Sequence, residues 1–284
     1  MSGVDPGSNG EGPTAAEAIE TGTDKLLVDF PAEAVARLTI SNPGKRNALD
    51  HEVLDAISST LPRLDRGIEV RCLVITGADP VFSAGYDIGS IADESFERDA
   101  EALVAHPFTA ALEALDAYPW PTVAALNGHC MGGGLELAIT CDLRICAAGA
   151  KLGMPPAKLG LIYGHTGLAR FIETVGAPRT RELFYTGDNI DATRAEAINL
   201  VNRVVPDAEI GPESIELART IAANAPLSTS GNKRAIATIV ANPLLSAEQE
   251  EELVELRQSC FVSDDFLEGI TAFGEKRKPR WTGR

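Results

Sequence analysis

Residues 127–138 read Asn-Gly-His-Cys-Met-Gly-Gly-Gly-Leu-Glu-Leu-Ala, and three consecutive glycines here lead from a predicted strand into a predicted helix. A helix N-terminus presents unpaired N–H groups and a partial positive charge, which stabilise a developing negative oxygen. The run is not a P-loop, because no Lys followed by Ser or Thr comes after the last glycine, and its spacing does not fit G-x-G-x-x-G. Close packing of helix on strand would explain the glycines equally well, so both interpretations stay open.

A second stretch, residues 81–88, reads Val-Phe-Ser-Ala-Gly-Tyr-Asp-Ile and follows a predicted strand and the turn Ala78-Asp79-Pro80. Small residues let a ligand approach the backbone, and Gly85 permits a positive φ, so the amide of Tyr86 can point into a cleft. A tight surface turn explains the same residues. Taken alone, this stretch therefore identifies no site.

Outward from these two stretches, strand and helix patterns alternate along the chain. Alternation of this kind predicts right-handed crossovers and a largely parallel sheet covered by helices, which is an α/β fold. We place an α/β core at 25–205 and a helical C-terminal portion at 206–284, after an acidic leader at 1–24 that we expect to be disordered. The predicted strands are 26–30 and 34–40, joined through a turn at Pro31, with 71–77, 122–126 and 142–147; the predicted helices are 49–64, 94–117, one from about 133, 212–224, 227–240 and 246–262.

Composition excludes several classes of function. A formal charge of −16 over 284 residues argues against a protein whose main task is to bind nucleic acid, because that binding relies on Lys and Arg. We find no apolar run near the ~20 residues that cross a bilayer. The five cysteines include no C-x-x-C pair, which argues against a zinc site and against a secreted disulfide framework. We therefore expect a soluble cytoplasmic protein without a metal, bound to neither nucleic acid nor membrane.

The pair of stretches F-S-A-G-Y-D-I and N-G-H-C-M-G-G-G-L-E-L-A resembles the crotonase (enoyl-CoA hydratase/isomerase) superfamily. Either stretch alone is unspecific, but their combination is specific, and the similarity covers nearly everything after residue 25. The resemblance implies a repeated ββα core that forms a spiral. It also implies trimers or hexamers built as dimers of trimers, which the C-terminal helices join, and an acyl-CoA substrate with no separate cofactor.

The resemblance also assigns roles to residues. The backbone amides of Tyr86 and Gly133 match the oxyanion hole, which holds the thioester oxygen as it acquires enolate charge. Coenzyme A would contact the following positions: Arg46, Ala48, Ser83, Ala84, Asp87 and Ile88, with Lys278 as a partner for its phosphates.

Two glutamates position and activate water in the archetypal hydratases of this superfamily. Glu136 matches the first, but Pro156 stands at the second position and offers neither acid nor base. The segment around it resembles methylmalonyl-CoA decarboxylase instead, where a tyrosine stands at the position of Tyr163. That decarboxylase carries a histidine where this chain has Tyr86, so the match is incomplete.

We expect a lyase resembling enoyl-CoA hydratase that acts in fatty-acid or related acyl-CoA metabolism, with Glu136 and Tyr163 as its catalytic side chains. The alternatives are a decarboxylase of short malonyl- or methylmalonyl-type thioesters, an acyl-CoA hydrolase, and a CoA-binding protein with little catalysis. His165, which follows Tyr163 closely, is interpreted as local structure at a helix start. Neither the acyl chain length nor the choice between trimer and hexamer follows from the sequence.

Overall fold

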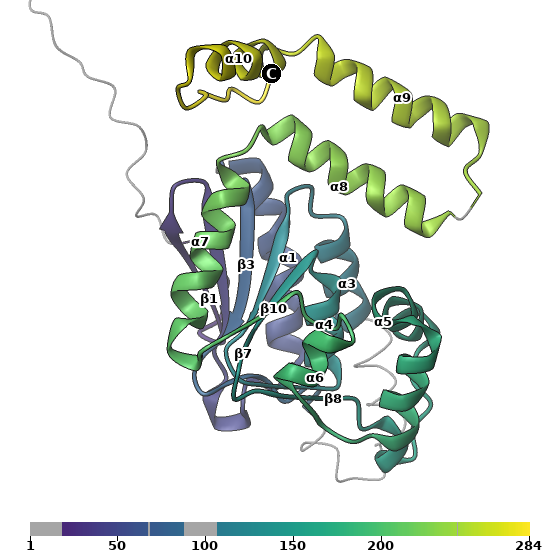
Figure 1. Ribbon diagram of the computed structural model, residues 1–284. Coiled ribbons are helices and arrows are strands. Elements are labelled where there is room, and N and C mark those ends of the chain that lie inside the picture. The colour runs from purple at the N-terminus through teal and green to yellow at the C-terminus, as the bar shows by residue number, and fades with distance from the viewer. Residues whose placement is uncertain (1–18, 68, 88–106, 243) are drawn as a thin grey trace, which may run out of the picture.

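The structure, a computed structural model, describes residues 19–67, 69–87, 107–242 and 244–284 (Figure 1). Within these ranges the main sheet has six strands in the order β1-β2-β3-β5-β7-β10. β1 and β2 pair antiparallel, and the neighbours from β2 to β10 are parallel, so the predicted α/β class is confirmed. The strands are β1 (Leu26–Ala32), β2 (Val35–Ile40), β3 (Cys72–Gly77), β5 (Thr122–Leu126), β7 (Leu143–Ala147) and β10 (Arg203–Val205).

A second sheet of short strands lies at one end of the main sheet. In the described part of the chain its order is β4 (Val81–Ser83), β6 (His129–Met131), β8 (Lys151–Gly153) and β9 (Ile190–Asp191). β4 pairs parallel with β6, which brings together the chain segments that continue into Tyr86 and Gly133. In the middle of the chain, one strand of each sheet is followed by a helix, as in β5, β6 and α4 (Gly133–Thr140) and in β7, β8 and α5 (His165–Thr186).

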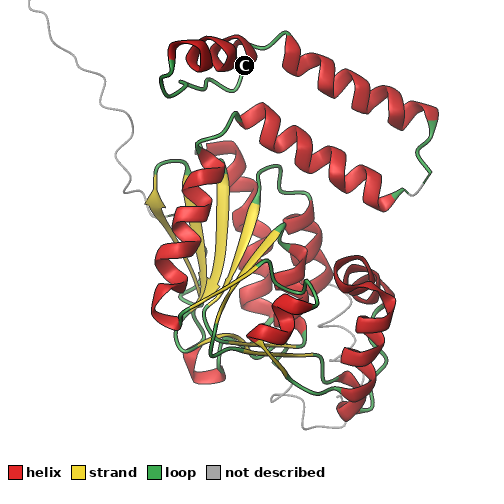
Figure 2. Ribbon diagram, viewed as in Figure 1, coloured by secondary structure: helices red, strands yellow, loops and turns green. Residues whose placement is uncertain are grey.

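Helices cover the main sheet on both sides (Figure 2). α7 (Ile210–Ala222) packs across β3 and β5, and α1 (His51–Gly67) packs against α3 (Thr109–Asp116). α1 is amphipathic at helical spacing, and its apolar face is fully buried. The residues of that face are Val53, Leu54, Ile57 and Leu61.

Three C-terminal helices lie beyond the end of the main sheet (Figure 1). They are α8 (Pro226–Ala241), α9 (Ala247–Phe261) and α10 (Asp264–Glu275). Lys233 on α8 joins them to the core, because its Nζ donates to the Trp120 carbonyl at 3.0 Å and lies 2.9 Å from Asp142 Oδ2. Among the described residues no helix combines the length and apolarity needed to cross a bilayer.

The structure corrects the predicted turn at Pro31. This residue lies inside β1, and the reversal occurs at Glu33 and Ala34, where Ala34 has a φ of 56°. β1 is an edge strand, so a missing N–H at Pro31 removes no bond to a further strand. Of the predicted helix 94–117, residues 94–106 lie outside the described residues, as do residues 1–18 of the leader.

The largest element that the sequence did not delimit is α5 (His165–Thr186), which changes direction at Gly176. Gly176 has φ 76° and ψ 158°, and Pro178 follows it. Both features interrupt the helical hydrogen-bond ladder, which explains why the periodicity breaks in the middle of the helix. The first half of α5 packs against α4, and this contact builds the site.

Candidate active site

The amide of Tyr86 is turned away from the strand-like segment beside it. Leu49 N donates to Gly85 O at 2.8 Å, and Asp87 N donates to Leu49 O at 3.2 Å, which forms a parallel bridge. In such a bridge the intervening residue directs its own N–H to the opposite side. Among the described residues no acceptor is paired with the Tyr86 N–H, so it is available to a ligand.

The amide of Gly133 is the second donor without an acceptor in the described part of the chain. Gly133 begins α4, and the N–H groups of a first helical turn have no acceptor within the helix. Gly132 precedes it with φ 52°, a conformation that L side chains rarely adopt, and its own N–H donates to Gly153 O at 2.9 Å. The Gly133 amide therefore combines an unpaired N–H with the positive end of a helix dipole.

The two free amides belong to neighbouring backbones. Gly85 has a φ of 90°, and a Cβ added to it would lie 3.2 Å from Gly133 N and 2.7 Å from Met131 O. Only glycine fits between these backbones, which is why the small residues of both stretches are needed. The structure thus brings Tyr86 and Gly133 together in a geometry that suits a developing oxyanion.

Glu136 lies one turn into α4 and is only 3% exposed. The hydroxyl of half-buried Tyr163 donates to Glu136 Oε2 at 2.5 Å. Gly167 on α5 backs this pair, because a Cβ there would lie 2.7 Å from Glu136 Oε1 and 2.6 Å from Tyr163 Cε1. The structure therefore brings both expected catalytic side chains into direct contact.

Burial sets the protonation of this pair. It raises the pKa of Glu136, and the Tyr163 hydrogen bond and the Arg170 charge oppose that rise. Burial also raises the pKa of Tyr163, as do the neighbouring Tyr86 and Glu136. A raised pKa keeps the Tyr163 hydroxyl protonated as a hydrogen-bond donor, and Glu136 is the more acidic group of the two.

Sequence reasoning missed an ion pair that flanks Glu136. Arg170 on α5 donates through Nη1 to Asp116 Oδ1 at 2.8 Å, and its Nη2 contacts the other oxygen of the same carboxylate at the end of α3. Both charges act on the Glu136 carboxyl, Arg170 lowering its pKa and Asp116 raising it. Nothing local in the sequence pointed to Arg170 or to Asp116, because the two residues meet only in the folded chain.

Pro156 stands at the position where the resemblance places a second glutamate. Pro156 is buried and begins the short helix η4 (Pro156–Leu159), so its position holds no proton-transfer group. His165 is exposed at the first residue of α5.

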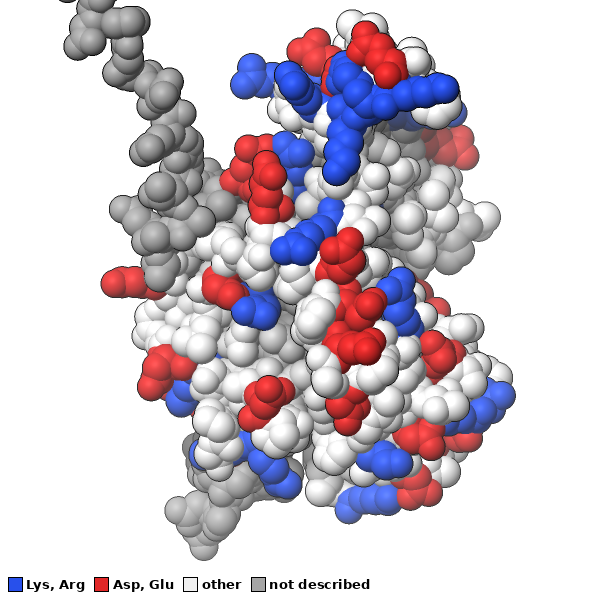
Figure 3. Space-filling model, turned by 60° about the vertical axis from the view of Figure 1, so that its left-hand side comes forward, with Lys and Arg blue, Asp and Glu red and all other residues white. Residues whose placement is uncertain are grey.

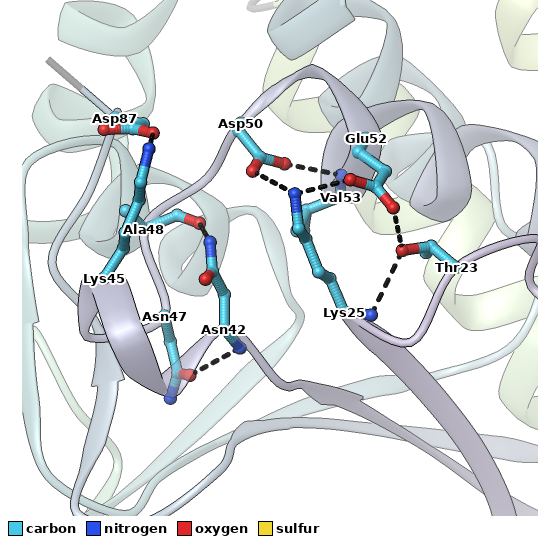
Figure 4. Close-up of polar contacts among 10 residues, drawn as sticks. All are labelled: Thr23, Lys25, Asn42, Lys45, Asn47, Ala48, Asp50, Glu52, Val53 and Asp87. Carbon is cyan, nitrogen blue, oxygen red and sulfur yellow. Dashed lines mark hydrogen bonds and ion pairs between the residues drawn. The ribbon is translucent and has the colours of Figure 1, made fainter. Parts of the chain in front are cut away.

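The predicted CoA-contacting segments lie side by side in the same loop region as Tyr86. Ala84 N donates to Arg46 O at 3.0 Å, and Ser83 Oγ donates to Asn47 O at 2.7 Å. Lys45 forms an ion pair with Asp87 across the two segments (Figure 4). Ala48 is buried behind them, and Ile88 lies outside the described residues.

Asn47 lies within the predicted CoA-contacting segment 46–48, but its structural role did not follow from the sequence. It is fully buried in a left-handed conformation with φ 54°. Its Nδ2 donates to Ala78 O at 2.7 Å and to Val81 O at 2.8 Å, while its Oδ1 accepts from Asn42 N at 2.9 Å. Asn47 therefore fixes the loop that carries Arg46 and Ala48.

Lys278 is not brought to these residues within one chain. It is exposed in the tail after α10, which lies apart from α4 and α5 (Figure 1). Lys and Arg side chains gather over these C-terminal elements in Figure 3, although the whole chain is acidic. The basic residues of this tail are Lys276, Arg277, Lys278, Arg280 and Arg284.

Comparison with known proteins gives one consistent result. The sequence profile described as enoyl-CoA hydratase/isomerase matches residues 31–284. The "probable enoyl-CoA hydratase" of Mycobacterium leprae is 36% identical over 261 residues, which are 92% of this chain and 99% of that protein. The crotonyl-CoA hydratase of Syntrophomonas wolfei is 35% identical over 260 residues, covering 89% of this chain and 96% of that protein.

Solved structures agree. The crystal structure of an enoyl-CoA hydratase from Bacillus anthracis superposes with a TM-score of 0.84 at 30% sequence identity. The match covers 92% of this chain and 100% of that one. The predicted spiral fold is thereby confirmed.

Proposed function

Because this chain belongs to the enoyl-CoA hydratase/isomerase family, we propose that it is a lyase that adds water across the double bond of an enoyl-CoA thioester. The observation that carries this proposal is the Tyr163–Glu136 hydrogen bond beside two unpaired amides. The amides supply a place for enolate charge, and the carboxylate supplies a group that exchanges a proton.

In the proposed reaction the thioester oxygen accepts hydrogen bonds from the amides of Tyr86 and Gly133. Glu136 accepts a proton from water, the water oxygen bonds to the β-carbon, and the electron pair of the double bond moves to the thioester oxygen. Glu136 then returns the proton to the α-carbon as the enolate collapses, so one water is added. Tyr163 donates to Oε2, and the absence of a side chain at Gly167 leaves room beside Oε1, the oxygen that would accept the proton. One oxyanion donor contributes about 10² to 10³ in rate.

The test is hydration of crotonyl-CoA, followed by the loss of absorbance of the conjugated thioester. We expect turnover by the wild type and a loss of about 10³ or more in Glu136→Gln, because the amide cannot accept the proton of water. Wild-type turnover no greater than that of Glu136→Gln would contradict hydration.

A second candidate is decarboxylation of a short malonyl-type thioester, which Pro156 and Tyr163 favour. The carbon–carbon bond to the carboxylate breaks, CO₂ leaves, and the electron pair moves to the thioester oxygen held by the same two amides. Tyr163 orients the carboxylate, and the α-carbon then takes a proton. Release of CO₂ from methylmalonyl-CoA that is undiminished in Tyr163→Phe would exclude Tyr163 from such a reaction.

The same preparations separate the remaining alternatives. Hydrolysis releases the free thiol of coenzyme A, which a thiol reagent detects. Calorimetric binding of acyl-CoA without turnover of any of these thioesters would indicate a CoA-binding protein.

We also propose assembly into trimers, or dimers of trimers, through the C-terminal helices. Large apolar side chains are exposed there, including Phe273 at 89% and Leu267 at 67%. Exposed apolar side chains that lie close together in this way support the proposal of an interface. Because Lys278 lies apart from the site of its own chain, its contact with CoA phosphates would come from a neighbouring copy. Sedimentation at micromolar concentration measures the assembly.

The cytoplasm is the compartment that we propose. All five cysteines are free thiols, and four of them are buried. Free thiols persist in a reducing compartment.

A further inference from the structure

The side chain of Tyr86 performs no task in the reaction proposed above, which uses only its backbone amide. Yet this ring lies inside the site. A Cβ added to Gly133 would lie 3.0 Å from Tyr86 Cζ and 3.1 Å from its Cε1, so the ring rests directly on the second oxyanion glycine.

The ring is held on three sides. The ring atoms Cζ, Cε1 and Cε2 lie against Gly133. The ring packs edge-to-face on Phe108, with ring centroids 4.6 Å apart, and its hydroxyl interacts with that of Tyr163. Phe108 is itself buried, at 3% exposure. A ring that is fixed in this way acts as a wall, whereas a free side chain would swing aside for a larger ligand.

The Tyr86 ring lies beside the position that the acyl group would occupy in the proposed reaction. In the proposed reaction the thioester oxygen binds the amides of Tyr86 and Gly133, which would place the α- and β-carbons within reach of Glu136. The Tyr86 ring spans the same interval, from Gly133 to the hydroxyl of Tyr163, which in turn donates to Glu136. The ring therefore narrows the space through which an acyl chain longer than these carbons would have to pass.

From this geometry, and resting on the proposed acyl-CoA function, we propose that the Tyr86 side chain is the specificity-determining residue that restricts this enzyme to short acyl groups. Removal of the ring would open space beside the bound acyl group. The backbone amide, which the reaction requires, would remain in any substitution except proline.

The test measures binding rather than turnover, with the saturated thioesters butyryl-CoA and decanoyl-CoA in calorimetric titrations. We expect the wild type to prefer butyryl-CoA. In Tyr86→Ala and Tyr86→Val we expect the affinity ratio to move toward decanoyl-CoA by about tenfold, as roughly two further methylene groups become buried. Tyr86→Phe keeps the ring and should keep most of the preference. Tyr185→Ala, which removes an exposed tyrosine of α5, is the matched control.

Each result decides something. An affinity ratio that is equal in the wild type and in whichever of Tyr86→Ala and Tyr86→Val folds would overturn the role of the ring, as would a wild type that binds decanoyl-CoA more tightly than butyryl-CoA. Absence of binding of both thioesters would overturn the proposed acyl-CoA function itself, and this inference with it. Calorimetry thus distinguishes failure of the inference from failure of the function.

Discussion

The Tyr163 hydroxyl donates a hydrogen bond of 2.5 Å to Oε2 of Glu136, a carboxyl that is almost fully buried. Burial raises the pKa of Glu136, and this bond opposes the rise because it stabilises the ionised form. Tyr163 therefore keeps available the carboxylate that hydration needs, even though the surroundings disfavour charge.

Tyr163→Phe removes that stabilisation while keeping the ring. The pKa of Glu136 should rise further, so the acidic limb of the hydration pH profile moves to higher pH. We expect a kcat roughly ten- to a hundredfold lower at neutral pH, because a hydrogen bond to a charged group is lost. Steady-state kinetics from pH 5 to 9 measure both effects, with Tyr185→Phe as control. An acidic limb that stays in place would contradict this role.

The Arg170–Asp116 pair predicts two shifts of opposite sign. Arg170→Gln removes a positive charge that lowers the pKa of Glu136, so the acidic limb should move to higher pH. Asp116→Asn removes a negative charge that raises it, so the limb should move to lower pH. Arg203→Gln, which breaks the exposed pair with Glu213, should leave the profile unchanged. Shifts in the same direction for both variants would show that the pair acts through packing alone.

Local sequence patterns were enough to predict the longer helices and strands. The strand Thr122–Leu126 was predicted at its observed bounds and the helix from Gly133 at its observed start, because an apolar run and a glycine turn mark them. The second sheet was missed, because strands of two or three residues are too short to show alternation. The sequence predicts a turn at Pro31 because the pattern does not reveal that its strand lies at an edge of the sheet.

In the site, too, residues within local motifs could be predicted, and contacts between distant parts of the sequence could not. Tyr86, Gly133, Glu136 and Tyr163 stand within motifs, so the resemblance pointed to them. The partner of Arg170 is 54 residues away in the sequence, and a pairing at that distance leaves no trace in a single sequence. The role of Asn47 could not be predicted, because it consists of buried hydrogen bonds that only the folded loop reveals.

Gly167 should tolerate no side chain. A Cβ at this position would lie 2.6 Å from Tyr163 Cε1 and 2.7 Å from Glu136 Oε1, so Gly167→Ala must displace the catalytic pair. We expect a rate at least ~10-fold lower and a free energy of unfolding lower by roughly 1–3 kcal/mol. Gly274→Ala is the matched control, because a Cβ on that α10 glycine meets nothing within 4 Å. Its stability should be unchanged or higher by up to ~1 kcal/mol. Full activity of Gly167→Ala would contradict the observed packing.

Glu136→Gln should abolish hydration and yet stabilise the protein. Because the folded pKa of Glu136 is raised, the folded chain holds this proton more tightly than the unfolded chain. Ionisation therefore destabilises the fold: the loss is absent below the unfolded pKa, grows as pH rises through it, and is complete above the folded pKa. The neutral amide of Glu136→Gln does not ionise, so the variant lacks this loss of stability. The gain in the free energy of unfolding is about 1.4 kcal/mol for each tenfold difference in the proton affinity of Glu136 between the folded and unfolded chains. Urea denaturation should give a higher free energy of unfolding for Glu136→Gln than for the wild type at pH 8, and this difference should shrink toward pH 4. A difference that instead grew as the pH fell would mean that Glu136 is stabilised as a carboxylate in the fold.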